Sequence, residues 1–321
     1  MTDKYGRIID YMRVSIIDRC NLRCQYCMPT DIKWIPPQEI LSLEEITEIC
    51  RQASQIGIKK IKVTGGEPLI RKGCVDLIRM LKEIPGIEQV TLTTNGVLLA
   101  QYAEQLNNAG LDAINVSLDT LDPEKYLKIT QSDALADVLD GISAIEKYDI
   151  PLKINSVLQR GVNDSDWQEL IGLAKDRRID VRFIEMMPIG HGKQFDPISN
   201  AEILQKLREH YGAVEEVEKV RGNGPATYCH IPAFTGNIGF ISAIHGKFCS
   251  ACNRIRLTST GQIKPCLCYE DHISLKEAVR SGRTDEIQKL LLSAIDRKPD
   301  GHRFDESEMI TEKHEMAQIG G

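Results

Sequence analysis

The sequence lacks three features that would place the protein in a membrane, outside the cell or on nucleic acid. It contains no apolar run of 18 residues, and its N-terminus lacks the charged-then-apolar profile of a signal peptide. It also lacks a basic excess, since its formal net charge is −6, whereas binding to nucleic acid phosphates normally needs surplus Lys and Arg. These absences argue against membrane and nucleic acid partners and predict a cytoplasmic protein.

Cysteine, by contrast, is plentiful. Ten cysteines occur among 321 residues. In a reducing cytoplasm they are expected to be thiols or metal ligands rather than disulfides. The length allows one large domain or two smaller ones.

The first cysteine group has the spacing C-x3-C-x2-C and consists of Cys20, Cys24 and Cys27. It follows an alternating apolar run, residues 11–17, that is typical of a strand. A short loop brings the three sulfurs together, where they can share one metal centre. Zinc and four-iron clusters both usually take four protein ligands, so three cysteines predict a [4Fe-4S] cluster with one open iron. A structural zinc loop that borrows a distant histidine remains an alternative.

The second cysteine group consists of Cys249, Cys252 and Cys266, with Cys268 two residues further on. Spacing alone leaves a zinc ribbon open. Two arginines interleaved with this group favour another interpretation. Arg254 and Arg256 point to the same side of an extended chain and suit an anionic ligand, which they can hold through paired hydrogen bonds.

Six strand-helix units follow one another up to about residue 187. Sequential units of this kind predict a parallel sheet, because each helical crossover starts a parallel neighbour. Polar and unusual residues gather near the carboxyl ends of the expected strands, at 18–20, 65–68, 93–95, 117–119, 155–156 and 185–187. Barrels place their chemistry on that face. We therefore expect an α/β fold with an incomplete (β/α)6 TIM-type barrel.

The pattern changes beyond this point, which places a domain boundary near residue 190. Residues 1–190 would form the partial barrel, and residues 191–321 an α+β region that carries the second cysteine group. Within the barrel, the run Ser42 to Glu45 has the pattern of a capping box and predicts the start of a helix. The spacing of apolar residues predicts that residues 164–177 form the helix of the fifth unit. From residue 298 on the chain is polar and poorly patterned.

The first cysteine spacing, with an aromatic residue before its last cysteine, resembles the signature of the radical S-adenosylmethionine (SAM) enzymes. The turn Gly65-Gly66-Glu67-Pro68 is similar to the family segment that contacts the amino group of SAM. The resemblance implies that SAM binds the open iron and is cleaved reductively to methionine and a 5′-deoxyadenosyl radical.

A narrower resemblance covers nearly the whole chain. Residues 12–15, the run Cys249 to Arg256, Cys266 and the terminal Gly320-Gly321 look like the GTP 3′,8-cyclase family, which opens molybdenum cofactor biosynthesis. It implies a lyase that converts GTP to (8S)-3′,8-cyclo-7,8-dihydroguanosine 5′-triphosphate with SAM and two [4Fe-4S] clusters, each held by three cysteines. The implied roles are cluster ligands at Cys20, Cys24, Cys27, Cys249, Cys252 and Cys266; SAM contacts at Tyr26, Gly66, Ser117 and Met187; GTP contacts at Arg13, Lys62, Thr93, Lys153, Arg254, Ile255 and Arg256; and catalytic roles for Arg182, Gly320 and Gly321.

The resemblance also implies partners. These are a reductant such as flavodoxin or ferredoxin and a downstream cyclic pyranopterin monophosphate synthase, with a homodimer left open. Two departures stand out: Lys62 replaces a frequent arginine, and Cys268 is an extra thiol not expected to be a ligand. The diglycine end is either a frayed terminus or a tail that reaches the active site. A radical peptide-modifying enzyme with an auxiliary cluster and a non-catalytic zinc or iron-sulfur protein remain the alternative functions.

Overall fold

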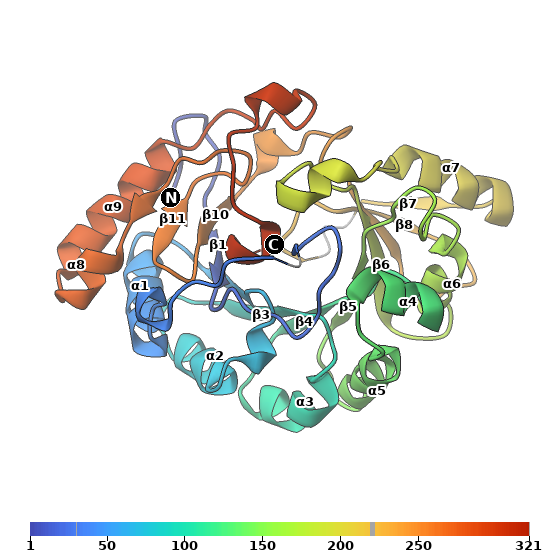
Figure 1. The fold of residues 1–321 in the computed structure, drawn as a ribbon, viewed down its shortest axis with the longest axis horizontal. Helices are drawn as coiled ribbons and strands as arrows, with labels where there is room; N and C mark the ends of the chain where they lie inside the picture. The colour runs from blue at the N-terminus through green and yellow to red at the C-terminus, as the bar shows by residue number, and fades with distance from the viewer. Residues whose placement is uncertain (30, 219–221, 321) are drawn as a thin grey trace.

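The computed structural model describes residues 1–29, 31–218 and 222–320, whose strands form one continuous sheet (Figure 1). The order along this sheet is β12-β11-β10-β1-β2-β3-β4-β5-β6-β9-β8-β7. Its central strands are β1 (Tyr11–Ser15), β2 (Lys60–Thr64), β3 (Gln89–Thr94), β4 (Ala113–Ser117), β5 (Leu152–Ser156) and β6 (Ile179–Ile184).

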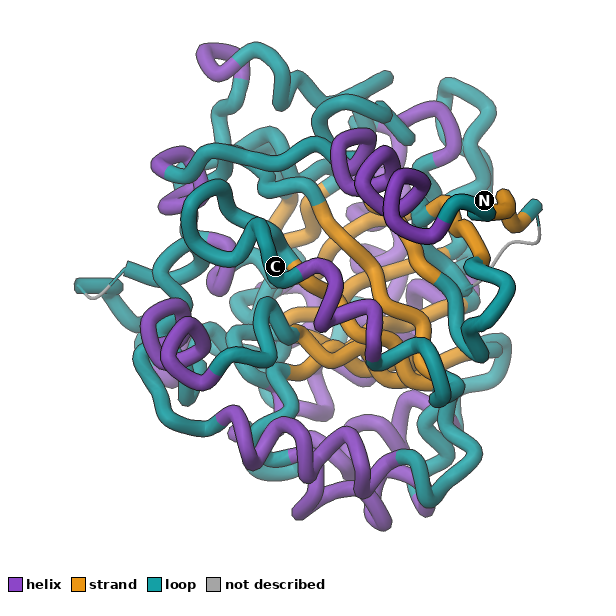
Figure 2. The backbone as a smooth tube through the Cα atoms, turned by 90° about the vertical axis from the view of Figure 1, so that its right-hand side faces the viewer, coloured by secondary structure: helices purple, strands orange, loops and turns teal. Residues whose placement is uncertain are grey.

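These six strands are parallel and follow one another in chain order. The intervening helices are α1 (Leu43–Gln55), α2 (Cys74–Lys82), α3 (Leu99–Asn108), α4 (Pro123–Thr130), α5 (Leu135–Ile145) and α6 (Trp167–Gly172). Figure 1 shows α1, α2, α3 and α5 along the outer side of the curved sheet, and Figure 2 shows the strands inside a shell of helices and loops. The predicted incomplete (β/α)6 barrel is confirmed.

The region beyond residue 190 extends the sheet at both edges. At one edge β9 (Ile238–Ile241) pairs parallel with β6 and is followed by antiparallel β8 (Thr227–His230) and β7 (Glu215–Val217). At the other edge β10 (Arg254–Leu257) pairs parallel with β1 and is followed by antiparallel β11 (Gln262–Lys264) and β12 (Ile273–Ser274). The two predicted regions therefore share one sheet, and the division near residue 190 stays a prediction.

Three further helices and several 3-10 turns complete the chain. The helices are α7 (Asn200–Tyr211), α8 (Lys276–Arg280) and α9 (Thr284–Asp296), and the turns are η1 (Pro37–Glu39), η2 (Pro68–Ile70), η3 (Gly190–Gln194), η4 (Cys249–Ala251), η5 (Ser307–Met309) and η6 (Met316–Gln318). None of the described helices is long and apolar enough to cross a membrane.

The start of α1 shows how local sequence sets an element. The Ser42 hydroxyl accepts a hydrogen bond from the Glu45 backbone N–H at 3.1 Å, and the Glu45 carboxylate accepts one from the Ser42 N–H at 2.7 Å. This capping box satisfies two backbone donors at the helix start. The apolar stripe that follows, including Ile46, Ile49 and Ala53, is fully buried.

The helix predicted over residues 164–177 was wrong in extent, because α6 covers only Trp167–Gly172. Tertiary hydrogen bonds hold the preceding residues in turns. The buried Asn163 side chain accepts from the Gln159 N–H at 2.7 Å and donates to the Asp119 carbonyl at 2.7 Å. The Asp166 carboxylate accepts from the Thr120 hydroxyl at 2.5 Å. These contacts outweigh the helical spacing of the apolar residues.

The C-terminal segment is better packed than its polar sequence predicts. It contributes to a second, smaller apolar cluster of buried residues, which are Ile189, Leu267, Cys268, Phe304, Ile310 and Ile319. Figure 1 shows the end of the chain near the centre of the curved sheet rather than at its rim. This segment is therefore part of the wall that surrounds the inside of the barrel.

Candidate active site

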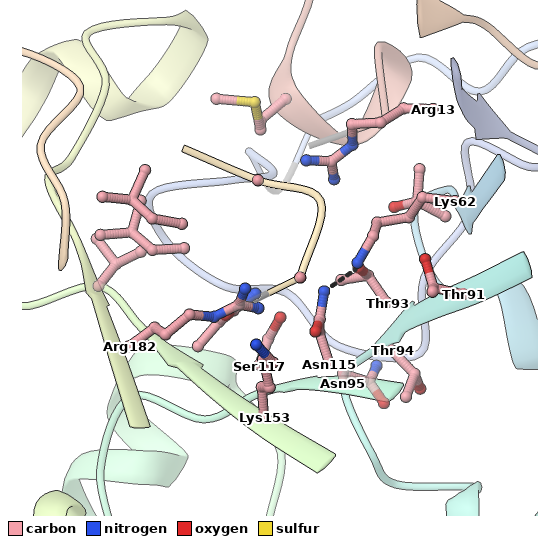
Figure 3. A pocket seen from close by; sticks show the side chains of 18 of the residues that line it. Arg13, Lys62, Thr91, Thr93, Thr94, Asn95, Asn115, Ser117, Lys153 and Arg182 are labelled. Carbon is pink, nitrogen blue, oxygen red and sulfur yellow. Dashed lines mark hydrogen bonds between the residues drawn. The ribbon is translucent and has the colours of Figure 1, made fainter. Parts of the chain in front are cut away.

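The inner face of the sheet encloses a cavity of about 850 Å³. Successive side chains of a strand point to opposite faces, so alternate residues of each strand face this cavity. Figure 3 shows side chains from neighbouring strands converging on it. The inward residues on the central strands and β10 include Arg13, Lys62, Thr91, Thr93, Asn115, Ser117, Lys153, Asn155, Asp180, Arg182, Arg254 and Arg256.

Six cationic side chains on the central strands and β10 face this cavity, and we call them the basic ring: Arg13, Lys62, Lys153, Arg182, Arg254 and Arg256. Arg178, which directly precedes β6, also lines the cavity. The sheet register explains their proximity, since Arg13 on β1 lies beside Arg256 on β10 and beside Lys62 on β2. Burial lowers the pKa of Lys62 well below its usual value, and the charges of Arg182 and Arg13 lower it further.

The basic ring favours a highly charged anion. Burial, together with the charges of Arg13 and Arg254, lowers the pKa of Arg256 to about 9. Within the ring, Lys153 lies 3.5 Å from the Asp180 carboxylate and donates to the Tyr228 hydroxyl at 3.0 Å. Buried cations that repel one another are stabilised by a bound anion, and arginine forks suit phosphate in particular.

Neutral hydrogen-bonding groups lie between these cations. Arg182 donates from Nε to the Asn155 side-chain oxygen at 2.9 Å. Asn115 donates to the Thr93 hydroxyl at 3.4 Å, a contact drawn in Figure 3. Sequence reasoning named Thr93 and Arg182 but missed Asn115, whose inward direction follows from the alternation of β4.

The first cysteine group lies at the carboxyl ends of the strands and lines the cavity. Burial raises the pKa of Cys24 well above its usual value, and the neighbouring Cys27 raises it further. Burial likewise raises the pKa of Cys27 to about 12, with Cys20 as the next cause. Thiolates gathered in so dry a place need positive metal between them, so this donor set fits an iron-sulfur cluster.

The Gly65-Gly66 turn holds this cysteine loop in place. The Gly66 N–H donates to the Ile17 carbonyl at 2.6 Å, and the Glu67 N–H donates to the Arg19 carbonyl at 2.8 Å. A Cβ on Gly66 would overlap the Arg19 carbonyl oxygen. Glycine is therefore required here for the close approach of two backbones, and Gly66 also lines the cavity.

The residues expected to contact SAM lie together next to the first cysteine group. Tyr26, Gly66, Ser117 and Met187 all line the cavity. The Tyr26 hydroxyl donates to the Asp119 carboxylate at 2.7 Å, and burial raises the pKa of Asp119 to about 6. Their contact with SAM stays a prediction.

The second cysteine group lies beside the basic ring. Cys249 accepts a hydrogen bond from the His302 N–H at 3.3 Å, and Cys252 is 4.0 Å from the Arg254 guanidinium. Burial alone would raise the pKa of Cys252, but the charges of Arg254 and Lys298 outweigh it and lower the pKa to about 7. A thiol that ionises near neutral pH is suited to bind metal.

Comparison with known proteins identifies the family. Residues 14–174 match the model of the Radical SAM superfamily, and residues 179–304 match Molybdenum Cofactor Synthesis C. Proteins called GTP 3′,8-cyclase are similar over the full length of both chains, at 43% identity in Clostridium perfringens (strain 13 / Type A) and 44% in Alkaliphilus oremlandii (strain OhILAs). The chain belongs to the GTP 3′,8-cyclase family.

Solved structures support the radical SAM fold. "Crystal structure of Streptococcus suis SuiB bound to S-adenosylmethionine" matches with a TM-score of 0.66 at 15% identity, covering 97% of this chain and 78% of that one. "Native anSMEcpe with bound AdoMet" matches with a TM-score of 0.53 at 14% identity, covering 92% and 82%. The predicted cofactors, SAM and two [4Fe-4S] clusters, are those of the GTP 3′,8-cyclase family and are confirmed at that level.

The family assignment favours iron-sulfur clusters over the zinc alternatives. Among the described residues, no group of three His, Cys, Asp or Glu side chains is placed to hold a single metal ion. Cys268 differs from the cysteines of the second group, since it is fully buried in the second apolar cluster and accepts from the Arg303 N–H at 3.5 Å. Burial raises the pKa of Cys268 to about 11, and its exclusion from the cluster stays a prediction.

The C-terminal tail of this GTP 3′,8-cyclase family member enters the cavity. Met316 and Ala317 line it, and the Gly320 carbonyl accepts a hydrogen bond from Arg256 at 3.1 Å. Gly320 has φ +76°, and a Cβ at this position would lie 3.0 Å from the Ser15 Cβ and 3.2 Å from the Thr64 Cγ2. Gly321 lies outside the described residues. The tail is therefore docked in the site up to Gly320, and its catalytic role stays a prediction.

Ile255 is placed differently from the other expected GTP contacts. Its side chain is fully buried in the main apolar core, whereas the neighbouring Arg254 and Arg256 line the cavity. Only the backbone of Ile255 is left to contact a ligand in the cavity. The other expected GTP contacts, including Lys62, Thr93 and Lys153, line the cavity, and their contact with GTP stays a prediction.

Proposed function

We propose that the chain converts GTP to (8S)-3′,8-cyclo-7,8-dihydroguanosine 5′-triphosphate as a lyase, the first step of molybdenum cofactor biosynthesis. The observation that carries this proposal is the basic ring, which faces one cavity lined by the first cysteine group, while Cys252 of the second group lies 4.0 Å from the Arg254 guanidinium of the ring. The full-length similarity to proteins called GTP 3′,8-cyclase supports it. A nucleoside triphosphate supplies the multiple negative charges that the ring favours.

In this proposal, different groups of residues around the cavity bind different parts of the substrate and cofactors. Arg13, Lys62, Lys153, Arg254 and Arg256 bind the triphosphate, and Thr93 binds a nearby polar group of the nucleotide. The second cysteine group, through its cluster, sets the position of the guanine base. Bound at the first group, the cluster and SAM supply the radical chemistry that the reaction needs.

The remaining residues hold and enclose the reactants. Tyr26, Gly66, Ser117 and Met187 hold SAM against the cysteine loop. Arg182, fixed by its 2.9 Å hydrogen bond to Asn155, orients the nucleotide inside the barrel. Gly320 brings its backbone carbonyl into the site and helps to exclude water from it, and Gly320 and Gly321 take part in catalysis in this proposal. Closing the site in this way protects a reactive intermediate from side reactions.

The proposal includes a cellular setting. We infer a cytoplasmic protein that receives electrons from a reductant such as flavodoxin or ferredoxin. Its product passes to a cyclic pyranopterin monophosphate synthase. A homodimer is compatible with this scheme, and neither nucleic acid nor a membrane takes part in it.

Anaerobic turnover of the cluster-reconstituted protein tests the function. Dithionite and SAM are supplied with or without GTP, and mass spectrometry follows 5′-deoxyadenosine and any product isomeric with GTP. GTP-dependent formation of both supports the cyclase. If 5′-deoxyadenosine forms while GTP survives, the substrate is wrong and a peptide-modifying activity gains support. If neither forms with intact clusters, the radical chemistry itself is contradicted.

A further inference from the structure

The outer side of the first cysteine loop carries exposed cationic and apolar side chains. Trp34 is 36% exposed, and the Arg23 guanidinium lies 5.1 Å from the centre of its ring. Arg19 and Lys33 are exposed on the same loop. Aromatic and arginine side chains are enriched in protein interaction sites relative to the rest of the surface.

The end of helix α4 is hydrogen-bonded to the same loop. The Arg23 N–H donates to the Thr130 carbonyl at 2.9 Å, and the Gln25 N–H donates to the Ile129 carbonyl at 3.0 Å. These bonds bind the cysteine loop to the last turn of α4, where Leu127 is 48% exposed and Lys128 is exposed. We call this combined surface the loop face; it consists of Arg19, Arg23, Lys33, Trp34, Leu127 and Lys128.

The charge of the loop face is opposite to that of the whole chain. It carries four cationic side chains, against the exposed carboxylates of Asp31, Glu124 and Asp133 nearby in the sequence, which leaves a positive balance. The whole chain has a net charge of −6. A local positive field on an acidic protein steers an acidic partner to one place and repels it elsewhere.

The loop face also lies over the place where an electron must arrive. Arg19 and Arg23 are direct neighbours of Cys20 and Cys24 in the chain, and these two cysteines line the cavity from the inside. This step rests on the proposed function, in which reductive cleavage of SAM consumes one electron at the first cysteine group. Electron transfer weakens steeply with distance, so a donor must dock close to this loop.

We propose that the loop face is the docking surface for an acidic protein that carries one electron. The carrier binds through its carboxylates to Lys33, Lys128 and the arginines, and covers Trp34 and Leu127. It is oxidised by one electron while the enzyme is reduced by one. Positive charge attracts the carrier, and the exposed aromatic and aliphatic side chains provide the apolar centre of the contact.

Charge reversal at two lysines outside the cysteine spacing tests this docking surface. The variant Lys33→Glu/Lys128→Glu is compared with Lys147→Glu/Lys289→Glu, which makes the same charge change at exposed lysines next to α5 and on α9 (Figure 1). The probe is a flavodoxin, an acidic one-electron carrier. Its affinity in the oxidised state is measured by calorimetry, and 5′-deoxyadenosine formation is measured with reduced flavodoxin or with dithionite.

We expect the loop-face variant to bind flavodoxin about tenfold or more weakly at low salt and to lose flavodoxin-driven cleavage to a similar degree. Its dithionite-driven rate should remain within about twofold of the unaltered protein, because a small reductant needs no docking surface. High salt should shrink the difference in flavodoxin affinity. The milder variant Lys33→Gln/Lys128→Gln covers the case in which charge reversal prevents cluster assembly, and it should show a smaller selective loss.

Two outcomes would overturn the proposal. One is unchanged flavodoxin affinity in both loop-face variants, and the other is an equal loss in the matched variant with changes near α5 and on α9. Failure of the unaltered protein to cleave SAM with dithionite would instead contradict the proposed function. The two failures are therefore distinguishable.

Discussion

A buried ion pair anchors the C-terminal tail, and breaking it should release the tail from the cavity. The Lys264 ammonium lies 2.6 Å from the Glu312 carboxylate, and the two side chains are 1% and 0% exposed. Glu312 also accepts hydrogen bonds from the His314 backbone N–H at 2.8 Å and from its ring at 2.7 Å. Lys264 precedes Cys266 on the chain, and Glu312 precedes the turn η6, so the pair joins the second cysteine group to the tail.

The lowered pKa of Glu312 and the usual cost of breaking a buried ion pair give a similar strength for this anchor. Burial raises the pKa of Glu312, but hydrogen bonds from His314 and Lys264 outweigh it and lower the pKa from 4.5 to about 2. At about 1.36 kcal/mol per pH unit, this difference corresponds to roughly 3 kcal/mol. Removing one partner of a buried pair typically costs about 3–5 kcal/mol. The stabilisation is fully present above pH 4.5, where the unfolded carboxyl is ionised, and is lost as the pH falls towards 2.

The variant Glu312→Gln should therefore open the tail locally at neutral pH. Hydrogen-deuterium exchange with mass spectrometry would compare residues 315–320 with the central strands. An opening free energy lowered by about 3 kcal/mol predicts tail amides that exchange on the order of 100-fold faster, while β1 to β6 keep their protection. Glu308→Gln, at an exposed carboxylate of the same segment, is the matched control. Tail exchange within twofold of that control would refute the anchoring role.

Four further predictions concern the site. Cys24→Ala should abolish 5′-deoxyadenosine formation, measured by mass spectrometry, because the first cluster loses a ligand; substantial residual product would contradict the assignment. Arg254→Ala should weaken GTP binding about 10- to 100-fold in calorimetry, as expected for a lost charged hydrogen bond, while uncoupled SAM cleavage persists; normal GTP turnover would defeat this role. Gly66→Ala should lower the iron content of the reconstituted protein, since its Cβ would displace the Arg19 carbonyl, and full iron loading would contradict the tight contact. The hydrogen bond to Glu312 raises the pKa of His314 above 6.5, so the stabilisation by protonated His314 is fully present below pH 6.5 and is lost as the pH rises through the raised pKa. Hydrogen exchange of the tail amides, corrected for the intrinsic exchange rate, should therefore become faster over that pH range, and His314→Ala should remove this pH dependence.

The parts of the site that could be predicted from sequence depend on neighbours along the chain. Three cysteines within eight residues converge because the loop is short, whatever lies around them. The capping box of α1 needs only Ser42 and Glu45. The inward direction of Arg254 and Arg256 follows from strand alternation once β10 is recognised. The structure of each of these features is determined by residues that are close together in the sequence.

The features that sequence reasoning missed depend on partners far away in the chain. Lys298 is buried because its ammonium donates to the carbonyls of Arg254 and Pro265, both at 2.8 Å. Glu312 is buried because Lys264 neutralises it. No local pattern shows that a Lys or Glu is paired with a distant residue, so the sequence predicts that the segment after residue 298 is exposed to solvent. The pairing of β10 with β1 could not be predicted either, because the two strands are far apart in the sequence.

The pairing of β10 with β1 has a consequence for how the protein is made on the ribosome. β1 gains β2 on one side early, but its other partner is translated about 240 residues later, which at 5–20 residues per second takes roughly 10–50 s. During that interval the nascent chain presents an open sheet edge, the kind of surface on which unfinished chains associate. A fragment that ends near residue 190 would keep this edge permanently, together with a barrel that lacks Arg254 and Arg256. Such a fragment is expected to self-associate instead of remaining a free half-barrel. Residues 191–321 therefore complete the anion site and also cover the open sheet edge of residues 1–190.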